Sequence, residues 1–116
     1  MSLKSINPYN GNLIKTYKEH TLSQIEEKIN LGHQAWLNYK ETSFSSRTNL
    51  MLDLGKNLLV EKEKLAELMA LEMGKPLKDG VAEIEKCAAV CEYYASNAEN
   101  FLKDEIVKTD ATKSLI

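Results

Sequence analysis

The stretch LEMGKPL, residues 71–77, decides how the second half of this chain folds, because it ends one helical pattern and starts another. Gly74 suits the left-handed conformation that closes a helix, and Pro76 prevents the helix from continuing. Leucine and methionine recur at helical spacing before this stop. One long helix is predicted after it, from about Asp79 to Leu102, with an apolar side. That side consists of Val81, Ile84, Ala88, Cys91, Ala95, Ala98 and Leu102.

Two more helices are predicted upstream of this stretch. Thr21 is a good N-cap for the first, and Gln24, three residues later, completes a capping box. Serines at 43, 45 and 46 offer N-caps for the second, which should end near Val60. The apolar face of the first helix is predicted as Leu22, Ile25, Ile29, His33 and Trp36. The apolar stripe of the second is predicted as Leu50 or Met51, Leu54, Leu58 and Leu59.

The chain as a whole is predicted to be mainly α, with a short N-terminal β-hairpin and about four helices. Residues 1–20 form the hairpin, because Asn10-Gly11 is a strong turn signal before a short strand. Residues 21–103 form the helical part. Residues 104–116 are expected to begin extended segments that are cut short. A lone hairpin is marginal in water, and the last two helices are apolar over a wide arc, so we expect a larger body to cover them.

Composition and charge exclude several classes of function. The 116 residues carry 15 basic and 17 acidic side chains, a net charge of -2, and the charges are interspersed. This balance gives no electrostatic argument for binding nucleic acid or an anionic membrane. No apolar stretch reaches the roughly 20 residues that span a bilayer, and residues 1–9 lack a signal-peptide pattern. The expected location is the cytoplasm.

The two cysteines, Cys87 and Cys91, lie four residues apart on the long predicted helix, so both thiols should face the same way. They could be metal ligands together with His20 or His33, but zinc-binding cysteine pairs more often have a two-residue spacing. A catalytic thiolate needs a nearby base, a cation or a helix N-terminus, and mid-helix positions offer little of this. Packing as small apolar side chains is the favoured interpretation.

Three further candidates also have structural explanations. His33, on an apolar helix face, is expected to be a half-buried histidine without a catalytic role. The Gly74-Lys75 pair resembles part of a phosphate loop but lacks the upstream glycine and the following Ser or Thr, so a helix stop is favoured. Five aromatic residues could line a ligand tunnel, although core or subunit contacts are more usual at helical spacing. These are Trp36, Tyr39, Tyr93, Tyr94 and Phe101.

The order of several motifs resembles the aldehyde dehydrogenase family. The stretch at 71–77 is similar to that family's E-x-G-K-P element, and EIEKC at 83–87 and CEYYA at 91–95 follow at the family's distance. Upstream, NPYNG at 7–11 resembles its opening hairpin, and Trp36, Arg47 and Leu50 fall where its first helices carry such residues. The resemblance covers essentially all 116 residues. Details at 85–87, 93–95 and 101–102 look most like the bacterial succinate-semialdehyde dehydrogenase group.

This resemblance implies a parent enzyme about four times longer, with a Rossmann-like cofactor domain, a catalytic domain and an oligomerisation arm. Residues 21–103 would then be the helical N-terminal part of the cofactor-binding domain. Such enzymes oxidise an aldehyde to an acid with NAD or NADP, through a cysteine thiohemiacetal and a glutamate-activated water. In the family, the catalytic and cofactor-binding residues all lie beyond this region. The expected catalytic, cofactor-binding and metal sites of this chain are therefore none. The fragment should be inactive and should bind no cofactor.

The partners implied by the resemblance are the remainder of the same enzyme and further copies in a homo-oligomer, with a small aldehyde as the substrate of the parent. An alternative of another class is a stand-alone helical protein-interaction module. A chain whose apolar helix faces are satisfied internally would favour this alternative.

Overall fold

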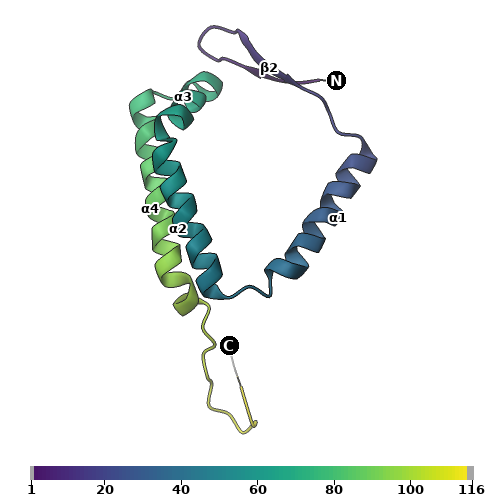
Figure 1. Cartoon of the computed structure of the whole chain (residues 1–116), viewed down its shortest axis with the longest axis vertical. Coiled ribbons are helices and arrows are strands. Elements are labelled where there is room, and N and C mark those ends of the chain that lie inside the picture. Colours follow the sequence, from purple (N-terminus) through teal and green to yellow (C-terminus); the bar gives the residue numbers. More distant parts are fainter. Residues whose placement is uncertain (1, 115–116) are drawn as a thin grey trace.

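The computed structural model describes residues 2–114, which form two strands followed by four helices. The elements are β1 (Leu3–Ile6), β2 (Leu13–Tyr17), α1 (Leu22–Tyr39), α2 (Phe44–Val60), α3 (Lys62–Met73) and α4 (Leu77–Phe101). Figure 1 shows α2, α3 and α4 packed together, with the hairpin above them and α1 apart on the other side. The prediction of a mainly helical chain with a short hairpin is confirmed.

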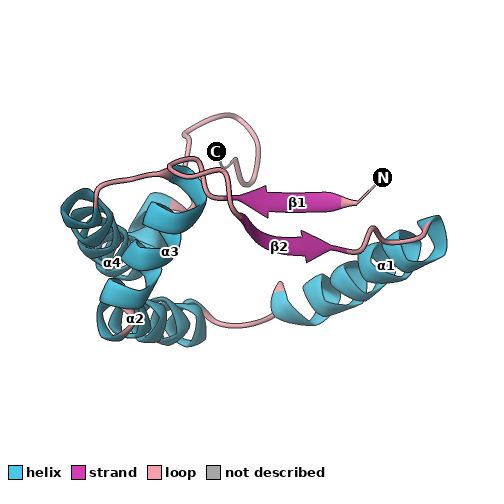
Figure 2. Cartoon of the chain, turned by 90° about the horizontal axis from the view of Figure 1, so that it is seen from above, coloured by secondary structure: helices cyan, strands magenta, loops and turns pink. Residues whose placement is uncertain are grey.

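The hairpin forms as its turn residues predict. β1 and β2 are antiparallel, with Leu3 opposite Tyr17 and Lys4 opposite Thr16. Gly11 has a φ of 73°, a left-handed conformation that glycine adopts without steric cost. Figure 2 shows this two-stranded ribbon extending from the end of α3 toward α1, outside the packed group of α2, α3 and α4. Among the described strands, β1 and β2 pair only with each other.

Local signals set the helix ends. Thr21 caps α1 in a complete capping box with Gln24, and the side chain of Ser43 caps α2. Gly74 closes α3 at a φ of 71°. The start of α4 at Leu77 lies two residues before the predicted start at about Asp79, because the amides of Asp79 and Gly80 both donate to the Pro76 carbonyl and so close the first turn directly after the proline.

The core lies where α4 crosses α2 and α3, and small residues allow the close approach. Its buried hydrophobic residues are Ala66, Ile84, Ala88 and Cys91. Gly55 and Gly80 are also buried, each against a neighbouring helix. The predicted stripe on α2 was therefore wrong in part. The helix turns Gly55 toward α4, which leaves Leu50, Leu54 and Leu59 exposed.

The C-terminal segment after α4 has little regular structure. Leu102 was predicted on the apolar side of α4, but it lies just past the helix end and is exposed. Ile106 forms an isolated bridge, and the amide of Val107 donates to the Ser114 carbonyl at 3.0 Å. The expectation that residues 104–116 begin extended segments stays a prediction, and its part on residues 115 and 116 lies outside the described residues.

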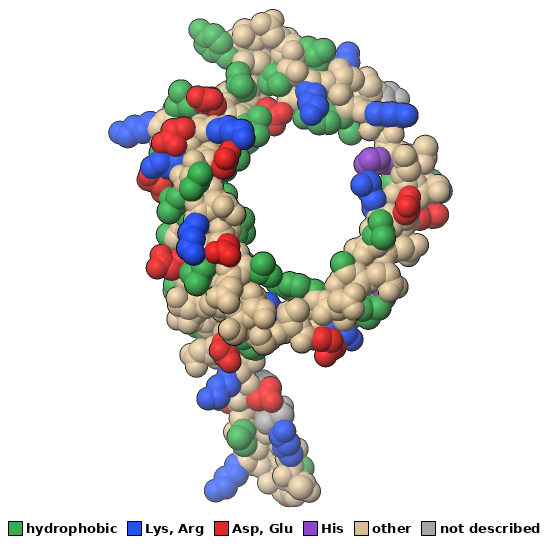
Figure 3. All heavy atoms as spheres, viewed as in Figure 1, with side chains coloured by type: hydrophobic (Ala, Val, Ile, Leu, Met, Phe, Trp, Pro, Cys, Tyr) green, Lys and Arg blue, Asp and Glu red, His purple; other side chains and the backbone are tan. Residues whose placement is uncertain are grey.

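The molecule is open for its length. Its Cα radius of gyration is 20.7 Å, whereas a compact domain of this size has about 13 Å. None of the residues of α1, all of which the structure describes, is buried. The space-filling view shows an opening between α1 and the other helices, with hydrophobic side chains along part of its rim (Figure 3).

Candidate functional site

The two cysteines have different surroundings, which corrects the prediction that both thiols face the same way. Cys91 is buried against α2, with its Cβ 3.4 Å from the position that a Cβ on Gly55 would take. Cys87 is exposed beside Glu83, Lys86 and Val90. Four residues turn a helix slightly more than once, and this offset is enough to move Cys87 off a narrow contact. The packing interpretation is confirmed for Cys91 alone.

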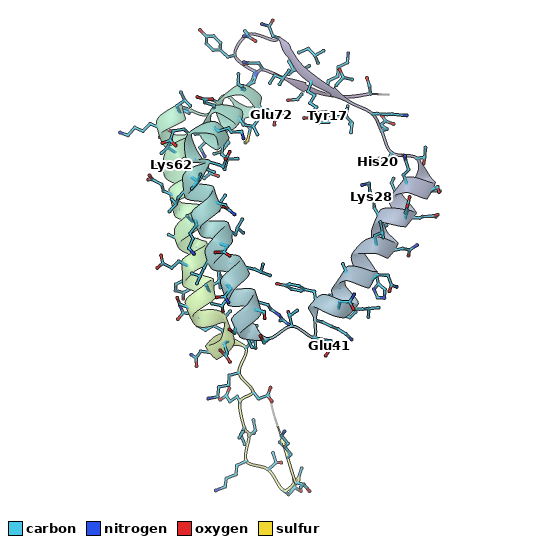
Figure 4. The ribbon with its side chains drawn as sticks, viewed as in Figure 1. Tyr17, His20, Lys28, Glu41, Lys62 and Glu72 are labelled. Atoms are coloured by element: carbon cyan, nitrogen blue, oxygen red, sulfur yellow. The ribbon has the colours of Figure 1, made fainter. Side chains whose placement is uncertain are left out.

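The histidines do not meet the cysteines. His33 stacks near Trp36 on α1, with 5.6 Å between ring centroids, and it is exposed where we expected it to be half-buried. His20 lies just before the N-cap of α1, across the opening from α2 (Figure 4). Among residues 2–114, no group of three or more His, Cys, Asp or Glu side chains could hold a metal ion.

The Gly74-Lys75-Pro76 corner is a helix stop, as predicted, and it is also the point where the hairpin meets the helices. The amine of Lys75 pairs with the Glu83 carboxylate of α4. The hydroxyl of Ser5 in β1 donates a hydrogen bond to the carboxylate of Glu72 at 2.8 Å; Glu72 is labelled in Figure 4. A Cβ on Gly74 would lie 3.2 Å from Pro8. This corner therefore joins three elements and has no bare cation available to hold a phosphate.

The five aromatic residues form two separate groups, so they do not line one tunnel. Trp36 and Tyr39 belong to α1. The amine of Lys40 lies over the Trp36 ring, and the guanidinium of Arg47 lies over the Tyr39 ring. Tyr93 lies 5.4 Å from Tyr94 and 6.1 Å from Phe101, measured between ring centroids. All five are about half exposed.

Two surface ion pairs among residues 2–114 involve lysines of α3. A hydrogen bond from Lys62 to Glu85, at 2.7 Å, joins α3 to α4 and raises the pKa of that lysine. A similar bond to Glu61 raises the pKa of Lys64. Both lysines stay charged at neutral pH and lie at the surface.

Sequence reasoning missed two features that the structure shows. Gly55 and Gly80 are interior helix glycines, which often mark close packing, and this was the signal that could have identified them. The guanidinium of Arg47 fixes the turn between α1 and α2 through three hydrogen bonds, to Thr42 Oγ1 and to the carbonyls of Lys40 and Thr42.

A dinucleotide cofactor does not fit the described residues. Gly11 and Gly74 lie in turns with positive φ, Gly55 and Gly80 are covered by neighbouring helices, and Gly32 is inside α1. No glycine among residues 2–114 therefore opens the strand-to-helix turn that cradles a pyrophosphate. Within the same residues, no helix is long and apolar enough to cross a membrane.

Comparison with known proteins gives the class. The model of the aldehyde dehydrogenase family matches residues 1–116. A probable succinate-semialdehyde dehydrogenase [NADP(+)] of Synechocystis sp. is 34% identical over 116 residues, which cover 100% of this chain and 26% of that protein. The succinate-semialdehyde dehydrogenase [NADP(+)] 1 of Mycobacterium tuberculosis is 37% identical over 113 residues, covering 97% of this chain and 24% of that protein.

Solved structures give the same fold. That of Gox0499 superposes with a TM-score of 0.91 at 25% identity, over 97% of this chain and 25% of that one. Succinic semialdehyde dehydrogenase from Streptococcus pyogenes, in complex with NADP+, gives 0.86 at 23% identity, over 95% of this chain and 24% of that one. The chain belongs to the aldehyde dehydrogenase family and corresponds to its N-terminal part. It spans about a quarter of the length of the curated relatives it matches.

Proposed function

We propose that this chain is the non-catalytic N-terminal part of an enzyme that oxidises succinate semialdehyde to succinate with NAD or NADP. The observation that carries the proposal is the identity of 34% over all 116 residues to a relative named for that substrate. NADP is the expected cofactor, because that relative and its mycobacterial counterpart are both named for it.

In this proposal, the residues that carry out the reaction lie outside this chain. A cysteine thiolate would form a thiohemiacetal with the aldehyde, and preorganised donors would stabilise its oxyanion. Neither Cys87 nor Cys91 is suited to that role. Cys91 is buried against α2, and Cys87 has no histidine beside it in the structure. Because the described residues do not fit a dinucleotide, no step through the nicotinamide is assigned to them.

The proposed partners are the remainder of the same polypeptide and further copies of the enzyme. The solvent-accessible surface area of the chain supports such partners. This chain exposes 9786 Å², whereas a folded monomer of 13.1 kDa exposes roughly 6,400 Å². The alternative of a stand-alone interaction module needs apolar faces that are satisfied within one chain, and the large exposed area disfavours it.

The test is an assay of the intact protein expressed from its own gene. Its mass is measured first and is expected to be several times 13.1 kDa. Reduction of NAD and of NADP is then followed with succinate semialdehyde and with a set of neutral and acidic aldehydes. We expect the highest kcat/KM with succinate semialdehyde and NADP. The 116-residue chain alone serves as the control and should give no turnover.

Each outcome decides a different part of the proposal. Turnover of other aldehydes with little of succinate semialdehyde would reject the substrate and keep the family activity. No turnover of any aldehyde would reject both. A mass of 13.1 kDa would reject the longer enzyme and support the interaction module.

A further inference from the structure

The turn of the hairpin contains an asparagine followed by a glycine, Asn10-Gly11, and both residues are exposed. A backbone amide nitrogen that follows an asparagine can attack the side-chain amide carbon, because the five-membered ring that forms has little strain. The side chain of the residue that supplies the nitrogen hinders this attack, and glycine has none. Asn10 is the only asparagine in the sequence that precedes a glycine. This turn is therefore where the chain favours the reaction most.

The other asparagines are poor sites for the same attack. Asn7 precedes Pro8, which has no amide hydrogen to lose. Asn12 precedes Leu13, whose side chain crowds the nitrogen at the start of β2. The remaining asparagines lie inside helices, where the amide that follows each one is held in the helical hydrogen-bond ladder. They are Asn30 and Asn38 in α1, Asn49 and Asn57 in α2, and Asn97 and Asn100 in α4.

A local hydrogen bond prepares the side chain of Asn10. The backbone amide of Asn12 donates to Asn10 Oδ1 at 3.0 Å. This bond folds the side chain back toward the two residues that follow it, which include the attacking nitrogen of Gly11. The same bond draws electron density from the side-chain carbonyl and stabilises the negative charge that develops on its oxygen during attack. Asn10 Cγ is therefore a better electrophile than it would be in a free side chain.

A second hydrogen bond restrains the attacking nitrogen. The amide of Gly11 donates to the Asn7 carbonyl at 2.8 Å, and it must leave this acceptor before it can lose its proton. The hairpin makes that opening easy, because all five residues of β2 are exposed and a two-stranded hairpin is only marginally stable by itself. Local opening therefore admits the attack while the helices stay folded.

We propose that Asn10-Gly11 is a site of spontaneous deamidation in the native protein. Once the bond from Gly11 to Asn7 opens, solvent base removes the Gly11 amide proton and the nitrogen bonds to Asn10 Cγ. The bond from Cγ to Nδ2 breaks, and Nδ2 leaves as ammonia with a proton from water. Water then opens the cyclic imide at either carbonyl, which gives aspartate or isoaspartate. The net reaction consumes one water and releases one ammonia, without oxidation or reduction.

Both products change the hairpin turn. Each replaces a neutral amide with a carboxylate, and isoaspartate also inserts a carbon into the backbone between residues 10 and 11. The longer backbone displaces the Gly11 amide from the Asn7 carbonyl and so weakens the bond that closes the turn. The turn also packs on the end of α3, where a Cβ on Gly74 would be 3.2 Å from Pro8 Cγ. Deamidation therefore loosens this corner. The inference is independent of the proposed function.

The pair Asp79-Gly80 is a control within the same chain. Aspartate before glycine forms the same cyclic imide and isomerises through it. Here Gly80 is buried, and its amide donates to the Pro76 carbonyl at 3.0 Å in the first turn of α4. Asp79 should therefore stay unmodified while the helix is folded and isomerise once the protein is unfolded.

Peptide mapping of the intact protein tests the proposal. The protein is incubated in mildly alkaline buffers of two pH values and, in parallel, in urea, and is then digested briefly with trypsin. Trypsin cleaves after Lys4 and Lys15, so one peptide, residues 5–15, contains Asn7, Asn10 and Asn12. Mass spectrometry measures the conversion of each asparagine, and electron-transfer fragmentation distinguishes isoaspartate from aspartate. A sample taken before incubation corrects for conversion during digestion.

We expect native Asn10 to convert at least about tenfold faster than Asn12, because Gly11 leaves its nitrogen unhindered. The rate should rise in proportion to the hydroxide concentration, and Asp79 should isomerise only in urea. Equal native rates at Asn10 and Asn12, or conversion of Asn10 in urea alone, would overturn the proposal.

The variant Ser5→Ala tests the opening step. It removes the hydrogen bond that ties β1 to Glu72, so the hairpin should open more often and native conversion of Asn10 should be faster than in the unsubstituted protein. In urea the variant and the unsubstituted protein should convert at the same rate. An unchanged native rate in Ser5→Ala would reject hairpin opening as the step that admits the attack.

Discussion

Gly80 of α4 lies so close to Ala66 of α3 that a Cβ on Gly80 would be 3.0 Å from the Ala66 Cβ and 3.1 Å from its Cα. A similar contact joins α2 to α4, where a Cβ on Gly55 would be 3.3 Å from the carbonyl oxygen of Ala88. Glycine normally weakens a helix interior by about 1 kcal/mol relative to alanine. Here each glycine lies where an added Cβ would make a tighter contact than usual with the neighbouring helix, which accounts for glycine at both positions.

The Gly80 contact makes a testable prediction about coupling. Gly80→Ala gains about 1 kcal/mol of helix propensity, but the new methyl overpacks against Ala66, which costs about 1–3 kcal/mol. We expect a net loss in the free energy of unfolding of the intact protein, measured in urea. The double variant with Ala66→Gly removes the opposing methyl, so it should be more stable than the sum of the single changes by at least about 0.5 kcal/mol. Strict additivity would contradict the contact.

The hairpin contact gives a second prediction. Ser5 donates to the carboxylate of Glu72, and this bond ties β1 to α3 at an exposed site. Ser5→Ala should lower the free energy of unfolding by about 0.5–1 kcal/mol and speed amide exchange in residues 3–17. Glu72→Gln keeps an oxygen acceptor without charge and should cost less. Unchanged exchange in Ser5→Ala would show that the bond does not hold the hairpin in place.

The features predicted correctly from sequence depend on interactions within about one helical turn. The Thr21 capping box and the Gly74 helix stop each involve neighbours close in the chain, so residue type alone indicates them. The predicted stripe of α2 was wrong in part: Met51 and Leu58 are half-buried as expected, whereas Leu54 and Leu59 are exposed because the contact with α4 centres on Gly55 and Ala88. A hydrophobic pattern marks which residues prefer to be buried. It does not show which of two apolar faces is covered by this chain and which by another body.

The candidate site shows the same limit. The absence of a phosphate loop at Gly74-Lys75 followed from local spacing, and the structure explains it with a helix stop and the Lys75–Glu83 ion pair. The different exposures of Cys87 and Cys91 did not follow from spacing. They depend on the narrow width of the α2–α4 contact, which small side chains on both helices set. That the catalytic and cofactor-binding residues lie outside this chain stays a prediction.

The Lys62–Glu85 bond predicts a pH dependence. Glu85 raises the pKa of Lys62 above its ordinary value of 10.5, so the folded state favours the charged amine. Its contribution to stability is present in full below pH 10.5 and is lost as the pH rises through the higher folded pKa. A titration of the Lys62 ε-methylene by NMR should therefore give a pKa above 10.5. Glu85→Gln should return it toward that value, while Glu92→Gln on the same helix should not. A pKa at or below 10.5 in the unsubstituted protein would refute this.

The turn between α1 and α2 depends on one side chain. The Nε of Arg47 donates to Thr42 Oγ1 at 3.0 Å, and its Nη2 donates to the carbonyl oxygens of Lys40 and Thr42 at 2.8 and 2.9 Å. The guanidinium also lies over the rings of Tyr39 and Phe44, 5.4 and 5.6 Å from their centroids. Arg47 is partly buried, and its two hydrogen bonds to Thr42 are partly shielded from water, whereas the bond to the Lys40 carbonyl is exposed. Arg47 thereby fixes the direction in which α1 leaves α2.

Arg47→Ala should therefore lower the free energy of unfolding of the intact protein by about 1.5–3 kcal/mol, the range for hydrogen bonds to a charged group. Arg47→Lys keeps the charge but has no planar fork to reach three acceptors, so it should recover less than half of that loss. The control Lys40→Ala removes an exposed amine and leaves the Lys40 carbonyl, so it should cost less than about 1 kcal/mol. Urea unfolding gives the energies, and amide exchange at residues 40–47 shows whether the loss is local to the turn. Full recovery by Arg47→Lys would mean that charge alone, without the bonding geometry, holds the turn.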